Sequence, residues 1–295
     1  MAMTAARPAP APQTTYDLDI RDVEYLRHDS GALLARLLVP KGTGPFPMIL
    51  DLHGGAWCNG DRLNDMQILE PLARSGVVVA ALDFRMPPTA GYPASLADIH
   101  YGIRWLKTQA TRLHGRADRV GVIGISSGGH QAMLLGMRPD DARYAALPLA
   151  GGPDARIQGA ILCWPVIDPL GRYHRALELQ AGGGTYPEAI DRVIPLHRQF
   201  WPDEAAMSEG SPALALERGE PAELPPVLYL QGTADQMHPR PHLDRFVAAY
   251  RKRGGDVDLA LYDGEVEGFI NRKPGTPNAV AATQRIIDFV HSRMA

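Results

Sequence analysis

Six short apolar runs, bounded by glycine, proline or polar residues, recur along the chain, and their lengths are typical of buried β-strands. We expect these strands at residues 46–52, 77–84, 119–125, 157–165, 226–231 and 257–262. Between them, apolar residues recur every three to four positions, which is the spacing of an amphipathic helix. We expect helices at residues 64–74, 92–112, 131–137, 242–253 and 279–293. This alternation predicts an α/β fold, with a mainly parallel sheet flanked by helices.

Three segments depart from the alternation. Residues 16–28 and 32–40 alternate between apolar and polar side chains around an Asp-Ser-Gly turn, so we expect an antiparallel hairpin at an edge of the sheet. Residues 1–15 are rich in alanine and proline, which predicts a disordered tail. We therefore expect one domain over residues 16–295, with a mostly helical cap inserted at about residues 166–222, where no clean strand pattern occurs.

One turn between a strand and a helix carries a candidate nucleophile. The sequence Gly124-Ile125-Ser126-Ser127-Gly128 fits the pattern G-x-S-x-G, in which glycines leave room for a strained turn that exposes the serine. Ser126 would then lie at a helix N-terminus, where free N–H groups favour developing negative charge. The pattern indicates acyl transfer through a serine hydroxyl.

Composition excludes several other classes of function. A net charge of −3, with charges of both signs mixed along 295 residues, argues against a nucleic-acid partner. The absence of an eighteen-residue apolar run argues against a membrane span, and the absence of an apolar leader segment favours a cytoplasmic protein. The two cysteines show no metal-binding spacing, and nothing in the sequence implies a metal or an organic cofactor. A homodimer is left open.

Three further motifs occur in a fixed order around the serine. They are His53-Gly54-Gly55-Ala56-Trp57, the segment from Leu82-Asp83-Phe84-Arg85 to Trp105, and Gly232-Thr233-Ala234-Asp235. With these motifs, residues 16–293 resemble the α/β-hydrolase superfamily, and within it the hormone-sensitive-lipase-like and kynurenine-formamidase-like carboxylesterases. The resemblance implies hydrolysis of a carboxylic ester or related acyl bond.

The resemblance also implies a role for individual residues. Ser126 corresponds to the nucleophile and Asp235 to the acid of a catalytic triad. The backbone N–H groups of Gly54, Gly55 and Ser127 would form the oxyanion hole, which stabilises the negative charge of the tetrahedral intermediate.

The chain departs from the family at the base. Related enzymes carry His-Gly-Phe after the last strand, whereas residues 267–269 are Glu-Gly-Phe, and no histidine occurs between His242 and His291. A free glutamate is a weak base for a serine hydroxyl, but burial beside a second carboxylate would strengthen it. We therefore favour an atypical Ser126-Asp235-Glu267 site.

Two alternatives remain for this departure. A histidine from elsewhere could serve as the base, and the candidates are His238, three residues after Asp235, and His130, one helical turn after Ser126. Alternatively, the protein has lost hydrolysis and binds a ligand, or carries out lyase- or decarboxylase-type chemistry with Glu267.

The substrate is a small molecule with an acyl group under the first two interpretations. A small or medium ester is the commonest substrate implied by the resemblance, and an amide, formamide or lactone fits nearly as well. The default expectation for the basic residues of the cap is that they are solvated, although one of them could meet a substrate carboxylate: Arg172, His174, Arg175, His197 and Arg198. Five aromatic residues are expected to form the pocket wall: Trp57, Trp164, Phe200, Trp201 and Phe269.

Overall fold

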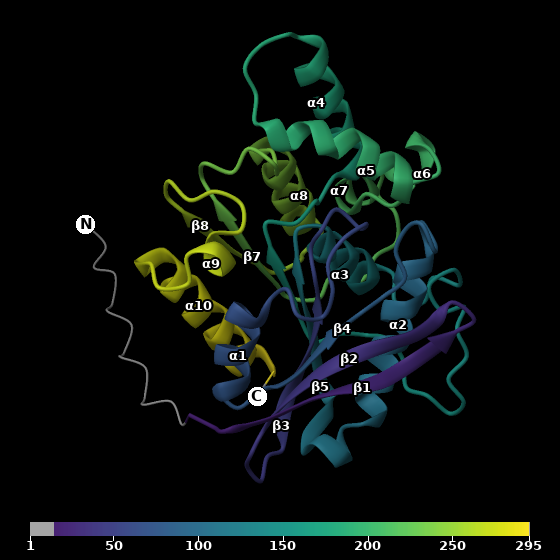
Figure 1. Ribbon diagram of the computed structural model, residues 1–295, viewed down its shortest axis with the longest axis vertical. Coiled ribbons are helices and arrows are strands. Elements are labelled where there is room, and N and C mark those ends of the chain that lie inside the picture. Colours follow the sequence, from purple (N-terminus) through teal and green to yellow (C-terminus); the bar gives the residue numbers. More distant parts are fainter. Residues whose placement is uncertain (1–14, 295) are drawn as a thin grey trace.

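The computed structural model describes residues 15–294, and an eight-stranded sheet runs through its centre (Figure 1). The strand order is β1-β2-β4-β3-β5-β6-β7-β8. The β1–β2 and β2–β4 pairs are antiparallel and all other pairs are parallel, so the predicted α/β fold with an edge hairpin is confirmed. The strands are β1 Leu18–His28, β2 Gly31–Pro40, β3 Phe46–Leu52, β4 Val78–Leu82, β5 Gly115–Ile125, β6 Ala160–Cys163, β7 Val227–Gly232 and β8 Val257–Tyr262.

Helices cover both faces of the sheet because its central strands are apolar on both sides. Successive residues of β3 illustrate this: Leu50 packs in the core shared with α2, α3 and α8, whereas Ile49 packs in the core shared with α1, α9 and α10. These helices are α1 Met66–Arg74, α2 Ala94–Thr108, α3 Ser127–Met137, α8 Arg240–Lys252, α9 Phe269–Arg272 and α10 Pro277–Met294. The short helix α9 was not predicted from the sequence.

The segment in which we expect a cap lies between β6 and β7. Its helices α4, α5 and α6 are at the top of Figure 1, beyond the carboxyl ends of the parallel strands. A third apolar cluster joins it to the rest of the protein through Trp57, which packs against Phe200 and Trp201. The elements are α4 Pro169–Ala181, the 3₁₀ helix η2 Glu188–Arg192, α5 Val193–Phe200, α6 Glu204–Glu209 and α7 Pro212–Glu217; a further 3₁₀ helix, η1 Thr111–Leu113, precedes β5.

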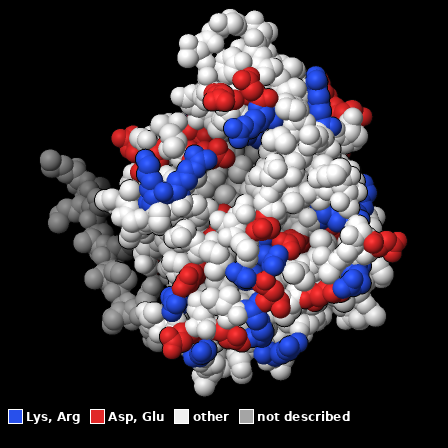
Figure 2. Space-filling view, viewed as in Figure 1, with Lys and Arg blue, Asp and Glu red and all other residues white. Residues whose placement is uncertain are grey.

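The charge distribution of the surface agrees with the sequence. Basic and acidic side chains alternate over the face shown in Figure 2, with no extended area of one sign. Within residues 15–294, no helix combines the length and the apolar character that a membrane crossing requires. Residues 1–14 of the expected tail lie outside the described residues.

Two carboxyl groups are buried at the ends of the segment between β3 and α1: Asp51 lies in β3 and Asp65 directly precedes α1. Asp51 is 1% exposed, and neither of its side-chain oxygens has a hydrogen-bond partner among the described residues. Asp65 is 2% exposed and accepts one hydrogen bond of 2.6 Å from Asn271 Nδ2. Burial raises the pKa of Asp65 to about 7, and burial together with the charge of Asp65 raises the pKa of Asp51. The folded protein therefore holds protons that the unfolded chain would release in mildly acidic solution.

This buried pair makes a contribution to stability that decreases as the pH rises from about 4, because at Asp51 and Asp65 the native state binds more protons than the unfolded state. Buried histidines such as His130 and His197 act in the opposite sense, since burial lowers their pKa, so the contribution of the pair is measured as a difference between two variants. We expect urea unfolding at pH 5, 6, 7 and 8 to show that Asp65→Asn gains roughly a few kcal/mol of stability relative to the parent as the pH rises, because the buried carboxyl that must lose its proton is gone.

The exposed turn residue Asp29 provides the control, since Asp29→Asn should leave the pH dependence of the parent unchanged. The interpretation is wrong if the parent and Asp65→Asn show the same slope.

Candidate active site

Ser126 occupies a strained turn between β5 and α3, as the motif predicts. Its backbone has φ of +52° and ψ of −113°, a conformation that non-glycine residues rarely adopt. The turn is tied to the end of β6, because Ser126 N–H donates to Cys163 O at 2.9 Å and Ser126 O accepts from Val166 N–H at 3.0 Å. A Cβ at Gly128 would lie 2.0 Å from Leu52 O, so this position requires glycine.

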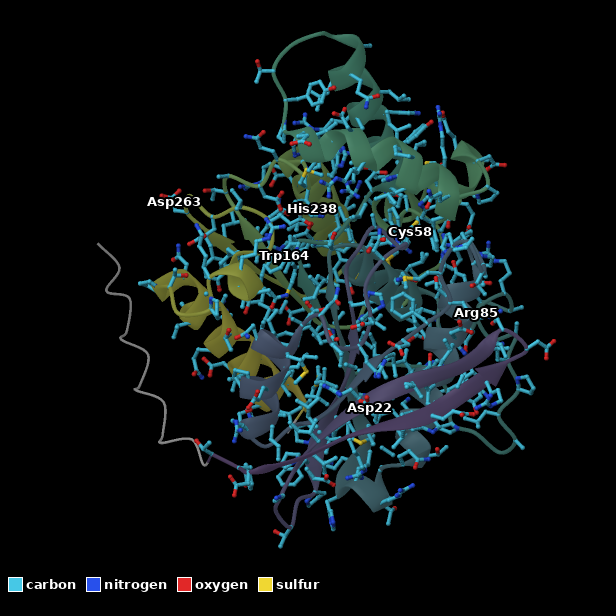
Figure 3. The ribbon with its side chains drawn as sticks, viewed as in Figure 1. Asp22, Cys58, Arg85, Trp164, His238 and Asp263 are labelled. Carbon is cyan, nitrogen blue, oxygen red and sulfur yellow. The ribbon has the colours of Figure 1, made fainter. Side chains whose placement is uncertain are left out.

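A chain of hydrogen bonds links Ser126 to the loop after β7. Ser126 Oγ lies 3.1 Å from His238 Nε2, and His238 Nδ1 lies 2.9 Å from Asp235 Oδ2. All three side chains are buried, with 9% or less of each residue exposed. His238 is labelled in Figure 3. The geometry is that of a Ser–His–Asp triad in which acid and histidine come from one turn.

Asp235 is held in the ionised form by its neighbours. Its Oδ1 accepts backbone N–H groups of Met237 at 2.8 Å and His238 at 3.0 Å. Burial opposes ionisation, but the attraction of His238 and these hydrogen bonds outweigh it and lower the pKa of Asp235. The carboxylate can therefore orient the imidazole and stabilise a positive charge on it.

The expected base, Glu267, is not hydrogen-bonded to Ser126 or Asp235 in the described part of the chain. The histidine bonded to Ser126 is His238, the first of the two relocated histidines considered above. The reason is local: the chain turns back after Asp235, so a ring three residues later reaches the serine. Glu267 is half-buried in the turn before α9 and faces the same cavities as Ser126.

The other relocated candidate, His130, is bonded elsewhere. Its Nε2 lies 2.8 Å from Gly210 O, and its Nδ1 accepts the indole N–H of Trp57 at 3.1 Å. Burial lowers the pKa of His130 to about 4, so this side chain is neutral at neutral pH. His130 therefore joins the cap to α3 and does not reach Ser126.

The glycines expected to form the oxyanion hole lie beside the serine. Gly54 and Gly55 line a cavity with Ser126, and Ser127 is the first residue of α3. The loop is fixed against that helix, because Trp57 N–H donates to Ser127 Oγ at 3.1 Å. Gly55 has φ of +109°, and a Cβ there would lie 1.9 Å from Asn59 O, so the turn excludes a side chain.

Four of the five aromatic residues expected in the pocket wall do not line the cavities that contain Ser126. Trp57, Phe200 and Trp201 are each 1% exposed and pack on one another, with ring centroids 5.3 Å apart for Trp57–Phe200 and 5.5 Å for Trp57–Trp201. They form a core between the cap and the glycine loop, because large aromatic surfaces are stabilised by mutual burial. Trp164 does line a cavity with Ser126, and Phe269 packs behind it at 5.5 Å (Figure 3, where Trp164 is labelled).

Two cavities open on Ser126. One, of about 180 Å³, includes Trp164, Asn271 and Asp65, and the other, of about 250 Å³, includes Arg172 and Met237. Gly55, Ser126, Glu267 and Arg272 line both cavities. A larger cavity of about 610 Å³ lies elsewhere and contains no triad residue. Sequence reasoning did not identify Asn271, Met237 or Arg272 as cavity residues, since none belongs to a motif.

Comparisons with known proteins show similarity to esterases and to a dehydratase. A family model described as BD-FAE matches residues 36–161. Esterase LipC of Mycobacterium tuberculosis is 26% identical over 222 residues, which are 74% of this chain and 52% of LipC, so the chain spans about half the length of that relative. The 2-hydroxyisoflavanone dehydratase of Glycyrrhiza echinata is 25% identical, over 89% of this chain and 82% of the dehydratase.

A solved structure supports the same assignment of fold. The esterase of Pyrobaculum calidifontis superposes with a TM-score of 0.74 at 21% identity, covering 94% of this chain and 87% of that one. The chain is therefore an α/β-hydrolase by fold. The curated proteins similar to this chain also include the carboxylic ester hydrolase LipN of Mycobacterium tuberculosis, which is 27% identical over 97% of this chain and 73% of LipN.

The geometry predicts that His238, rather than Glu267, controls the reactivity of Ser126. We expect His238→Ala to slow labelling of Ser126 by a serine-directed phosphonate at neutral pH by about a hundred- to ten-thousandfold, because the hydroxyl loses its proton acceptor. Glu267→Gln should change the labelling rate far less. The measurement is the rate of covalent modification followed by mass spectrometry.

Ser126→Ala is the control that shows where the label attaches, and it should not be modified. A Glu267→Gln variant that labels as slowly as His238→Ala would restore glutamate as the base.

Proposed function

We propose that the protein is a hydrolase of small carboxylic esters, with Ser126 as nucleophile, His238 as general base and Asp235 as acid. The observation that carries the proposal is the buried hydrogen-bond chain from Ser126 Oγ through His238 to Asp235. The similarity to esterases supports the same reaction class.

The first half of the reaction is acylation of the serine. His238 Nε2 removes the proton of Ser126 Oγ as the oxygen attacks the ester carbonyl, and Asp235 stabilises the imidazolium that forms. The carbonyl oxygen becomes an oxyanion, which would accept hydrogen bonds from the backbone N–H groups of Gly54, Gly55 and Ser127 under this proposal. Each such donor is worth roughly 3–4 kcal/mol of transition-state stabilisation.

The second half releases the products. His238 returns its proton to the oxygen of the leaving alcohol, the ester C–O bond breaks, and the acyl group remains on Ser126 Oγ. Water then loses a proton to His238 and attacks the acyl carbonyl, and collapse of this second intermediate frees the carboxylic acid and the serine. No metal is needed for either half.

The two cavities support a small or medium substrate. They meet at Ser126, so one can hold the acyl part of an ester and the other its alcohol part. Volumes of about 180 and 250 Å³ accommodate short groups rather than long lipid chains.

A second candidate function is non-hydrolytic chemistry in the same pocket. The observation that favours it is the similarity to a dehydratase, together with a carboxylate, Glu267, that lines both cavities with Ser126 and stands where the motif resemblance leads one to expect histidine. In that case Glu267 would move the proton and Ser126 would be dispensable.

The proposed function predicts that the protein hydrolyses 4-nitrophenyl butyrate and that Ser126→Ala lowers kcat by at least about a thousandfold, because the variant has no nucleophile. The readout is release of 4-nitrophenolate with purified protein. Equal rates for the parent and Ser126→Ala would contradict ester hydrolysis through Ser126 and favour the non-hydrolytic candidate.

A further inference from the structure

Arg172 is a buried cation in the wall of the cavity that contains Ser126. It lies in the first turn of α4, only 6% of the residue is exposed, and it lines the cavity of about 250 Å³. Charged side chains are rarely buried to this extent without a partner, because removing a charge from water is costly. The hydrogen bonds of Arg172 therefore indicate whether the protein itself supplies acceptors for the N–H groups of the guanidinium.

The protein satisfies only part of this guanidinium. Nε donates to Met237 O at 3.1 Å, which ties α4 to the loop that carries Asp235 and His238. Nη1 is buried and has no hydrogen-bond partner among the described residues. A guanidinium carries five N–H donors in a planar fork, and the structural bond to Met237 uses one of them.

The nearest carboxylates do not accept the remaining N–H groups of the guanidinium. Burial lowers the pKa of Arg172, and the charges of Glu267 and Asp235 oppose that shift, so both acids lie close enough to interact with it. Neither forms an ion pair with Arg172 among residues 15–294, since Asp235 is taken up by His238. A buried donor without a partner is costly, and a bound anion would supply the missing acceptor.

The surroundings of the cavity favour an anion as well. Arg192 and Arg272 also line it, at exposed positions, so three arginines face one carboxylate, Glu267. An excess of positive charge in a concave site concentrates anions there. Of the three arginines, Arg172 is the buried one. It also contacts the loop that carries Asp235 and His238, through its hydrogen bond to Met237 O.

We propose that the natural substrate is an ester that carries a carboxylate, and that the free face of the Arg172 guanidinium binds this carboxylate while Ser126 attacks the ester carbonyl. The inference rests on the proposed function and names its substrate class. The carboxylate belongs to either the acyl or the alcohol part, and the two cases share the same recognition by a planar, charge-assisted pair of hydrogen bonds.

The test compares matched esters that differ only in this charge. Monoethyl succinate is paired with ethyl 4-methylpentanoate for a carboxylate on the acyl side, and butanoyloxyacetate with isobutyl butyrate for one on the alcohol side. We expect at least one charged ester to have the higher kcat/KM. Arg172→Met should lower the charged-to-neutral ratio of kcat/KM for that pair by about ten- to a hundredfold, and Arg172→Lys should lower it less.

The ratio separates recognition from structure. Loss of the bond to Met237 could displace His238, but this would slow both members of a pair alike and leave their ratio unchanged. Arg175→Met is the matched control, because Arg175 lies on the same helix three residues later and does not line the cavity, so its ratio should equal that of the parent.

Binding to Ser126→Ala gives a readout that does not require turnover. We expect calorimetry to show tighter binding of one charged ester than of its neutral match, and Arg172→Met in that background to remove the difference. Equal ratios for the parent and Arg172→Met, or equal binding of charged and neutral esters, would overturn the inference while leaving neutral ester hydrolysis intact. Failure of the proposed function would instead show as hydrolysis that does not depend on Ser126.

Discussion

The fold and the site depend on one constraint: three buried polar side chains must satisfy one another across the carboxyl end of the sheet. Ser126 follows β5 and His238 follows β7, 112 residues later, and β6 lies between the two strands. A displacement of either strand would leave a buried hydroxyl or imidazole without a partner, which costs free energy that apolar packing cannot recover. The pairing of the parallel strands therefore determines whether the His238 ring lies within hydrogen-bonding distance of Ser126.

The positions of the strands along the chain followed directly from the sequence because their composition is unambiguous. Residues 46–52 and 226–231 are apolar runs that only a sheet covered on both faces can bury. The boundaries were harder where tertiary contacts end an element: β6 contains only Ala160–Cys163, since Trp164 turns to a positive φ and Pro165 follows. Helix α9 is a single turn, too short for periodicity to reveal.

The candidate site was foreseen in part. The motifs around Gly54 and Ser126 carry backbone requirements, such as the positive φ of Ser126 and the close approach of Gly128 to Leu52, and such requirements leave a local signature in the sequence. The histidine that is hydrogen-bonded to Ser126, His238, leaves no such signature in the sequence. Whether a histidine three residues after Asp235 reaches a serine depends on the path of one turn, and position in a motif favoured Glu267 instead. The aromatic residues were misplaced for a related reason, since side-chain type does not distinguish a pocket wall from a core.

A histidine on the β7 loop changes what the β8 loop has to do. When acid and base share one turn, Asp235 can accept hydrogen bonds from both the backbone and the ring of His238. Proton transfer then does not require a histidine at position 267. Under the proposed mechanism, Glu267 is then free to act on the electrostatics of the cavity, opposite the arginines of α4 and α9. A carboxylate at that position offsets part of the positive charge of the arginines that line the cavity. A bound anion would then interact mainly with one cation, Arg172, rather than with several arginines at once.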